Sequence, residues 1–128
     1  MRRPISPNLH GVLDYITVAG LLLTSRSLPL PGTVRRLLQT SACLSLLYSV
    51  FTRYRFGLLK VVPMEEHLAL DLASAASLFL GPEMLGVHEP RSISLLRGLG
   101  VFETVVPLLT RTQRASERAL SSRSLPSA

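Results

Sequence analysis

The chain has 128 residues, which is the usual length of a single domain. Hydrophobic residues make up 47% of it and charged residues 17%, below the roughly 25% typical of soluble domains. The net charge is +6, but the basic residues lie between apolar segments, and only three tyrosines and four phenylalanines are available to stack on bases. Because a nucleic-acid-binding protein is expected to carry a clustered basic stripe with interleaved aromatic residues, we expect no nucleic-acid partner.

Four apolar segments are separated by short linkers rich in proline and glycine. They predict helices at about residues 8–25, 34–52, 63–80 and 93–110. These lengths lie at the short end of the roughly 17 to 25 residues that cross a bilayer, and no charged residue occurs between positions 37 and 52. A soluble bundle would need a full polar face on every helix. We therefore predict an all-α fold, a four-helix transmembrane domain within residues 1–110.

The basic residues predict the orientation of this bundle in the membrane. Nine basic residues are expected on the same side of the membrane as the two termini: Arg2, Arg3, Arg53, Arg55, Lys60, Arg111, Arg114, Arg118 and Arg123. Five lie on the other side: Arg26, Arg35, Arg36, Arg91 and Arg97. By the positive-inside rule both termini are expected to be cytoplasmic. Residues 111–128 are predicted to form a polar, disordered cytoplasmic tail, and Tyr15, Tyr48 and Tyr54 to anchor the bundle at the interface.

Two halves of the chain share landmarks at a constant spacing. The repeated landmarks are His10 with His67, Asp14 with Asp71, and the Thr-Arg pairs at 52–53 and 110–111. The first two pairs are 57 residues apart and the third is 58 apart. This spacing predicts two copies of a two-helix unit. Because each unit has an even number of spans, the two repeats are parallel and related by an axis along the membrane normal.

Each repeat places a histidine and an aspartate one helical turn apart, at the expected cytoplasmic end. Residues at i and i+4 share a helix face, so His10 lies over Asp14, and His67 over Asp71. Glu103 in the fourth segment is expected within about 2 Å of the same depth, at 1.5 Å per residue. Three ionised carboxylates in one layer need protons, the histidines or a bound cation. The second segment adds an inward polar stripe of Ser41, Ser45, Tyr48, Ser49 and Thr52.

Two interpretations of this polar layer stay open at the level of sequence. In the first, the four His and Asp residues form a structural lock between the first and third helices and bind nothing. In the second they form a site for a metal ion, with His10, His67, Asp14 and Asp71 as an N/O ligand set suited to zinc, iron or manganese, or a proton relay. Haem ligation by His10 and His67 is less favoured, because each histidine is followed by an acid that needs a partner.

Two short motifs resemble known membrane proteins. "SPNLHGVLDY" at residues 6–15, with "KVVPMEEHLALD" at 60–71, resembles small uncharacterised bacterial four-helix membrane proteins that begin with a Ser-Pro-x-x-His-Gly-x-x-Asp-Tyr signature. The layout is also similar to the SPW-repeat membrane proteins, in which Ser-Pro-Trp opens each of two helix pairs. Here Asn8 stands in place of that tryptophan, and the second copy reads Val-Pro-Met at 62–64. The resemblance implies four membrane-spanning helices in two pairs, in the inner membrane of a bacterium, and no particular activity.

The function expected from the sequence is therefore that of a small membrane scaffold or accessory subunit. No motif of nucleophilic catalysis or nucleotide binding occurs, which favours a non-enzymatic role. A bundle of this size has little room for a substrate, so besides the lipid bilayer we expect a second copy of the chain or a larger membrane protein as partner. The alternative is a metal-, haem- or proton-handling site at the cytoplasmic end.

Overall fold

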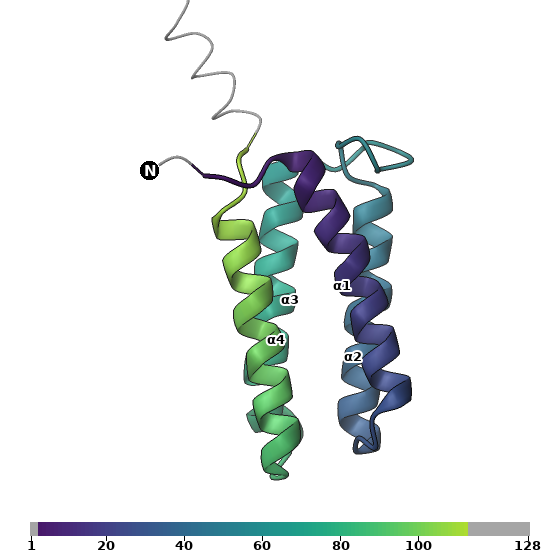
Figure 1. The fold of residues 1–128 in the computed structure, drawn as a ribbon, viewed down its shortest axis with the longest axis vertical. Helices are drawn as coiled ribbons and strands as arrows, with labels where there is room; N and C mark the ends of the chain where they lie inside the picture. The colour runs from purple at the N-terminus through teal and green to yellow at the C-terminus, as the bar shows by residue number, and fades with distance from the viewer. Residues whose placement is uncertain (1–2, 113–128) are drawn as a thin grey trace, which may run out of the picture.

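The computed structural model describes residues 3–112, and this part of the chain forms four α-helices joined by short loops (Figure 1). The helices are α1 (Pro7–Ser27), α2 (Gly32–Val50), α3 (Met64–Leu85) and α4 (Pro90–Leu108). The prediction of an all-α, four-helix fold is confirmed. Most of the tail predicted to be disordered, residues 113–128, lies outside the described residues.

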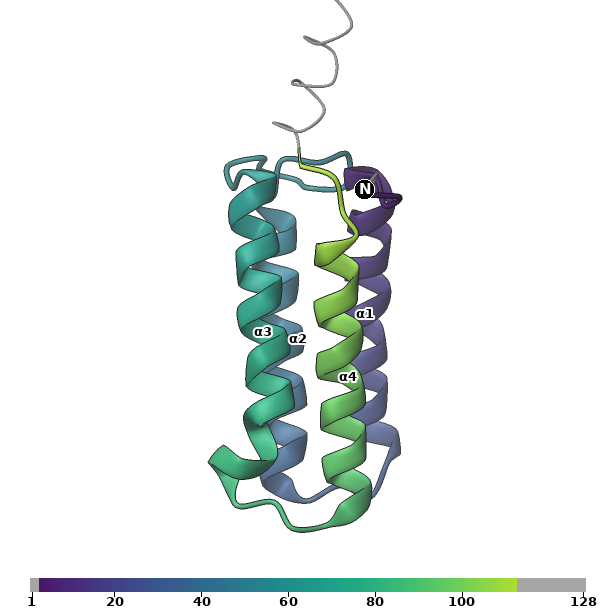
Figure 2. The same cartoon turned by 90° about the vertical axis from the view of Figure 1, so that its left-hand side faces the viewer.

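The helices run up and down in an antiparallel bundle (Figure 2). The closest pairs are α1 with α2 and α3 with α4, and α2 also packs on α3. One end of the bundle holds the starts of α1 and α3, the loop 51–63 and the end of α4. We call it the polar end, for the residues described below. The opposite end, with the loops 28–31 and 86–89, is called the apolar end.

Local sequence signals explain where the helices begin. Ser6 caps α1, because its hydroxyl accepts the Leu9 N–H at 3.2 Å, and Pro7 follows at the first helical position, where no hydrogen bond is lost. Glu89 caps α4, and its carboxylate accepts the N–H of Ser92 at 2.7 Å. These caps place the first turns of α1 and α4 within three residues of the predicted starts.

The end of α3 differs from the prediction, which placed it at residue 80. The Gly-Pro pair at 81–82 was expected to break the helix, yet α3 continues to Leu85. Pro82 lies in the last turns, where it costs only one backbone hydrogen bond. The helix stops at Gly86, whose φ of 64° is left-handed, and the Val87 N–H closes the turn on the Pro82 carbonyl at 2.8 Å.

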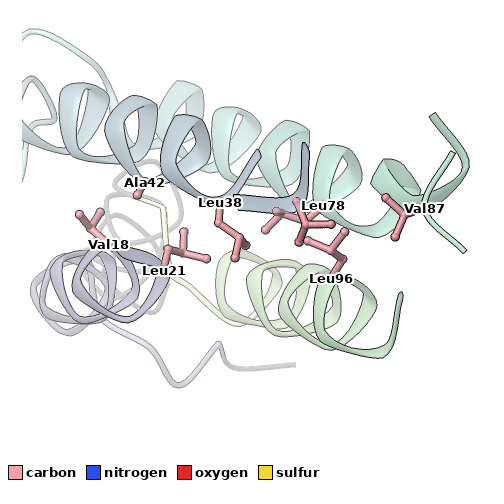
Figure 3. Packing of buried hydrophobic residues seen from close by; sticks show 8 residues of the cluster. Val18, Leu21, Leu38, Ala42, Leu78, Val87 and Leu96 are labelled. Carbon is pink, nitrogen blue, oxygen red and sulfur yellow. The ribbon is translucent and has the colours of Figure 1, made fainter. Parts of the chain in front are cut away.

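The interior changes in character along the bundle. At the apolar end it is a hydrophobic cluster from all four helices (Figure 3): Val18, Leu21, Val34, Leu38, Ala42, Leu78, Val87 and Leu96. Towards the polar end the inward side chains of α2 become polar, as the sequence predicted: Ser41, Ser45, Ser49 and, just past the helix, Thr52 are all buried. Among the described residues, the buried histidines and acids thus lie towards the polar end, whereas the buried polar groups at the apolar end are the hydroxyls of Ser25 and Ser92.

Candidate metal centre

Two histidines and two aspartates meet at the polar end of the bundle. His10 and Asp14 come from the first two turns of α1, and His67 and Asp71 from the first two turns of α3. One ligand atom from each of the four lies within 4.8 Å of all the others. We call these four residues the His/Asp centre. Both histidines are fully buried, and the aspartate side chains are only 10% and 11% exposed.

The contacts within the centre cross between the two helices. The Nε2 atom of His10 lies 2.8 Å from Asp71 Oδ2 and 3.1 Å from Asp14 Oδ1. The Nε2 atom of His67 lies 3.0 Å from Asp14 Oδ2 and 3.4 Å from Asp71 Oδ2. Each histidine is therefore closer to the aspartate of the other helix than to the one a turn below it. The predicted i, i+4 pairs are present, but they are the longer contacts.

Two threonines determine which nitrogen of each ring carries a hydrogen. The Thr52 hydroxyl donates to the Tyr48 carbonyl at 2.6 Å, and its oxygen lies 2.6 Å from His67 Nδ1. The Thr110 hydroxyl likewise donates to a backbone carbonyl of α4 at 2.8 Å, and its oxygen lies 2.7 Å from His10 Nδ1. Because a hydroxyl has one hydrogen, each threonine oxygen must accept from the imidazole. Both rings therefore hold a hydrogen on Nδ1 and present Nε2 to the aspartates.

Two tyrosines donate to the carboxylates from outside the four-residue group. The Tyr48 hydroxyl donates to Asp71 Oδ1 at 2.8 Å, and the Tyr54 hydroxyl donates to Asp14 Oδ2 at 3.1 Å. Both phenol rings also pack edge to face on the His67 imidazole, with centroids 5.0 and 5.7 Å away. Burial, together with the adjacent Asp14 carboxylate, raises the pKa of Tyr54, so this phenol stays a donor. The two rings shield the centre and orient its acids.

The loop 51–63 covers the centre through Tyr54, which is 5% exposed. A Cβ atom at Gly11 would overlap the Tyr54 ring, so only glycine at this position allows the ring to lie against α1. On the other side of the loop the Tyr15 hydroxyl donates to the Phe56 carbonyl at 2.9 Å. The loop is thus fastened to the first turns of α1 at two points.

Substituting Gly11 by alanine is expected to lower the thermal midpoint of unfolding, since the new methyl group collides with Tyr54 and overpacking costs about 1–3 kcal/mol. Gly20 is the matched control, because a Cβ there meets nothing within 4 Å and alanine favours the helix by about 0.5–1 kcal/mol. Circular dichroism melts of both variants in detergent measure the difference. Equal midpoints for the two variants would contradict this description of the loop.

Corresponding backbone contacts occur in the two halves of the chain. The Arg53 N–H donates to the Val62 carbonyl at 2.9 Å, and the Arg111 N–H donates to the Ile5 carbonyl, also at 2.9 Å. The donors are 58 residues apart and the acceptors 57. These bonds hold Thr52 and Thr110 beside the strand-like segments that lead into α3 and α1. Each threonine is thereby held within hydrogen-bonding distance of the histidine that it orients.

Glu103 does not belong to the His/Asp centre, although the sequence placed it in the same layer. It is 8% exposed and borders a small cavity of about 20 Å³, whose walls include Asp14, Tyr48 and Asp71. Its Oε2 atom accepts a hydrogen bond from Ser74 at 2.9 Å, while Oε1 has no hydrogen-bond partner. A cavity of this volume holds about one water-sized particle. Glu103 therefore faces the centre across a cavity rather than completing it.

The His/Asp centre fits a divalent transition-metal ion. A tetrahedral shell of nitrogen and oxygen at about 2.0–2.2 Å from zinc puts its ligand atoms about 3.3–3.5 Å apart. The four N···O contacts of the centre span 2.8 to 3.4 Å, and since the two contacts to Asp14 use different oxygens, this carboxylate would have to turn for one of its oxygens to share an ion with both nitrogens. The Nε2 atom of His67 is buried and makes no well-aligned hydrogen bond, although a carboxylate oxygen lies 3.0 Å away. The His67 Nε2 atom therefore lies close enough to a carboxylate oxygen for both to bind one ion, but it is not aligned to donate a hydrogen bond to that oxygen.

The structure also changes the roles predicted for several residues. Tyr48 and Tyr54, expected at the membrane interface, point inward to the aspartates. Thr52 was expected in the polar stripe of the second segment and, like Thr110, was recognised as a repeat landmark, but no contact with a histidine was predicted for either threonine. The same spacing of 57 and 58 residues that links the histidines could have identified these threonines, because it repeats both partners of each hydrogen bond. His88 is exposed, in the loop before α4.

A comparison of the chain with protein-family models, with curated proteins and with solved structures gave no match.

Proposed function

We propose that this chain is an integral membrane protein whose His/Asp centre binds one divalent transition-metal ion, such as Zn²⁺ or Mn²⁺, near the cytoplasmic surface. The observation that carries the proposal is the convergence of two Nε2 atoms and two carboxylates, from two helices, within 4.8 Å. Two carboxylates balance the charge of a dication, and both rings keep a hydrogen on Nδ1, so each Nε2 can bind a metal ion once it has given up its own proton. The threonines supply the outer hydrogen bonds that metal-binding histidines commonly make.

The outer surface of the bundle supports a membrane location. Large hydrophobic side chains are exposed on all four helices, among them Ile16, Leu23, Leu44, Leu47, Leu70, Leu80, Val101 and Val105. A water-soluble bundle would cover such faces with polar residues. Here the arrangement is reversed, since the histidines, Asp71, Glu103 and the serines of α2 towards the polar end are buried.

The lengths of the four helices and the apolar surface of α3 agree with this location. Each helix has 19 to 22 residues and is about 28–33 Å long, close to the hydrocarbon thickness of about 30 Å. Among the described residues only α3 passes a combined test of length and hydropathy for a span, and only 33% of its apolar window is buried. A core helix of a soluble protein would be mostly buried, so the outward apolar face of α3 favours lipid.

The internal repeat and the orientation belong to the same proposal. The paired contacts of the two threonines, and of Arg53 and Arg111, support two parallel two-helix units. The excess of arginine beside the polar end supports a cytoplasmic location for that end and for both termini. The resemblance to membrane proteins with the Ser-Pro-x-x-His-Gly-x-x-Asp-Tyr signature is in keeping with this location.

Haem fits the centre poorly. The two imidazole rings contact each other edge to face, with centroids 5.2 Å apart, and oxygens of both aspartates lie beside their Nε2 atoms. A porphyrin between the rings would have to displace both carboxylates. We therefore favour a bare metal ion over haem.

The metal proposal is tested with the purified protein in mild detergent. After treatment with a chelator, the protein is dialysed against Zn²⁺ or Mn²⁺ and its metal content is measured by mass spectrometry. We expect saturation at a single ion per chain. Saturation only at millimolar metal, or no uptake beyond that of a detergent blank, would overturn the metal proposal.

The membrane proposal has its own test. Membranes that contain the protein are washed with alkaline carbonate, and the protein is expected to stay in the pellet. With Cys43→Ser as background, Arg53→Cys is expected to react with a membrane-impermeant maleimide only after the cells are opened. Release by carbonate would refute the membrane location, and labelling in intact cells would refute the orientation.

A second candidate function is a scaffold or accessory subunit in which the same four residues only lock α1 to α3. The contact of His10 Nε2 with Asp71 at 2.8 Å favours it, because this bond joins the two helices without an ion. In that case the protein binds no metal, and removal of the histidines lowers only its thermal stability. The metal measurement above separates the two candidates.

A further inference from the structure

Glu103 is the one buried carboxylate near the His/Asp centre without a positive partner in the described part of the chain. No lysine, arginine or histidine among residues 3–112 lies within ion-pair distance of it. Its Oε2 atom accepts from Ser74, and Oε1 is buried without a hydrogen bond. A buried carboxylate with an unsatisfied oxygen is costly, so a ligand that satisfies it is expected.

The charges of the neighbouring centre do not compensate Glu103. With a dication, the two aspartates of the centre are balanced; with both histidines doubly protonated, they are balanced again. In either case the centre is neutral, and an ionised Glu103 leaves a single negative charge. One further positive charge then balances the buried ionisable groups at the polar end, whichever occupant the centre has.

The surroundings of Glu103 offer oxygen ligands only. The cavity at its carboxylate is also lined by Thr17, Ser45 and Tyr48, each with a hydroxyl. Pro107, another wall residue, has no N–H, so the backbone carbonyl of Glu103 loses its usual helical donor. Carboxylate, hydroxyl and carbonyl oxygens are ligands for hard cations, and no nitrogen or sulfur ligand for a softer ion is present among these residues.

The two halves of the chain differ at this point. Ser45 precedes Glu103 by 58 residues and Thr17 precedes Ser74 by 57, which are the spacings of the threonine and histidine pairs. In the first half a serine hydroxyl lies 3.1 Å from the Tyr48 hydroxyl, while in the second half a glutamate occupies the corresponding position. Beyond Asp14 and Asp71 of the centre, the cavity therefore has one further acid, Glu103, and not a symmetric pair.

We propose that Glu103 and the adjacent cavity form a second cation-binding position, deeper in the bundle than the His/Asp centre, that takes an alkali-metal ion such as Na⁺. Charge selects a monovalent ion, and the oxygen-only surroundings select a hard one. The volume of about 20 Å³ matches one small ion. This position does not depend on metal binding at the His/Asp centre.

The test measures binding of ²²Na⁺ to the purified, chelator-treated chain by equilibrium dialysis, with choline chloride keeping the ionic strength constant. The wild type is expected to bind one Na⁺ per chain. Glu103→Gln should weaken this binding at least about tenfold, since it removes the one carboxylate at the cavity whose charge the His/Asp centre does not balance. Glu66→Gln, which removes an exposed acid of α3, should not change the binding. Circular dichroism confirms that both variants keep their helices.

Two results would overturn the proposal. The first is a wild type without saturable ²²Na⁺ binding, which would mean that Glu103 is held as the uncharged acid. The second is equal binding by the wild type and Glu103→Gln. If Glu103→Gln does not fold, Ser74→Ala replaces it. We expect this variant to bind ²²Na⁺ several-fold more weakly than the wild type, and unchanged binding would contradict the proposal. The Zn²⁺ titration of the same samples reports separately on the His/Asp centre.

Discussion

Replacing His10 and His67 together by alanine is expected to abolish the binding of Zn²⁺ or Mn²⁺ to the purified chain. The change removes both nitrogen ligands and leaves two aspartates, which alone bind transition metals weakly. We expect metal content at saturation to fall from one ion per chain to the level of the detergent blank. The measurement is metal analysis after dialysis, as for the wild type.

The same double substitution is expected to destabilise the fold when no metal is present. It leaves Asp14 and Asp71 buried beside each other without their charged partners, and breaking a buried ion pair typically costs about 3–5 kcal/mol. The thermal midpoint should therefore fall in chelator as well. His88→Ala is the control, because His88 is exposed, and it should change neither quantity. Unchanged metal content in the double variant would exclude the His/Asp centre as the metal site.

The roles of the "SPNLHGVLDY" segment show how far sequence reasoning extends here. Ser6 caps α1, His10 and Asp14 enter the centre, Gly11 makes room for Tyr54, and Tyr15 holds the loop at Phe56. The i, i+4 pair was predicted, and the cap, which was not, follows from an equally local rule. The importance of Gly11 depends on a ring 43 residues further along the chain, so it could not be seen locally.

The composition of the centre was predictable, but its pairing was not. The regular spacing of His10, His67, Asp14 and Asp71 identified all four members before any coordinates. Which carboxylate each imidazole contacts depends on the rotation of α1 against α3, a property of tertiary packing that helical periodicity does not determine. For the same reason Glu103 was placed in the layer by depth along its helix, whereas its side chain lies across a cavity from it.

The end of α3 illustrates a limit of a different kind. The Gly-Pro pair at 81–82 is a strong helix-breaking signal, and the predicted helix ended just before it. The chain continues helical through both residues, because buried Gly81 lets Leu37 pack closely and Gly86 provides the left-handed stop. Two signals for a helix end competed within six residues, and the later one determines the boundary.

Replacing Thr52 and Thr110 together by valine is expected to weaken metal binding about 10- to 100-fold, the usual range when outer partners of ligating histidines are lost. Valine keeps the shape of threonine and removes the oxygen that accepts each Nδ1–H. A ring without this partner can move its hydrogen to Nε2, which then no longer binds metal, and can also rotate. Titration with Zn²⁺ gives the affinity, and the ¹⁵N shifts of the imidazoles report the tautomer.

Three variants distinguish this orienting role from a general loss of stability. Serine at both positions keeps the accepting oxygen and should restore most of the affinity. Thr104→Val removes a hydroxyl of α4 that bonds only to the Gly100 carbonyl, so it should leave the affinity unchanged. If the double valine variant bound Zn²⁺ as tightly as the wild type, the threonines would be helix-end hydrogen-bonding residues without influence on the ligands. Each of the two threonine hydroxyls donates to a backbone carbonyl near its own position and accepts from a histidine of the other half of the chain. A loss of metal affinity in the double valine variant alone would therefore show that the two halves of the chain form one shared centre.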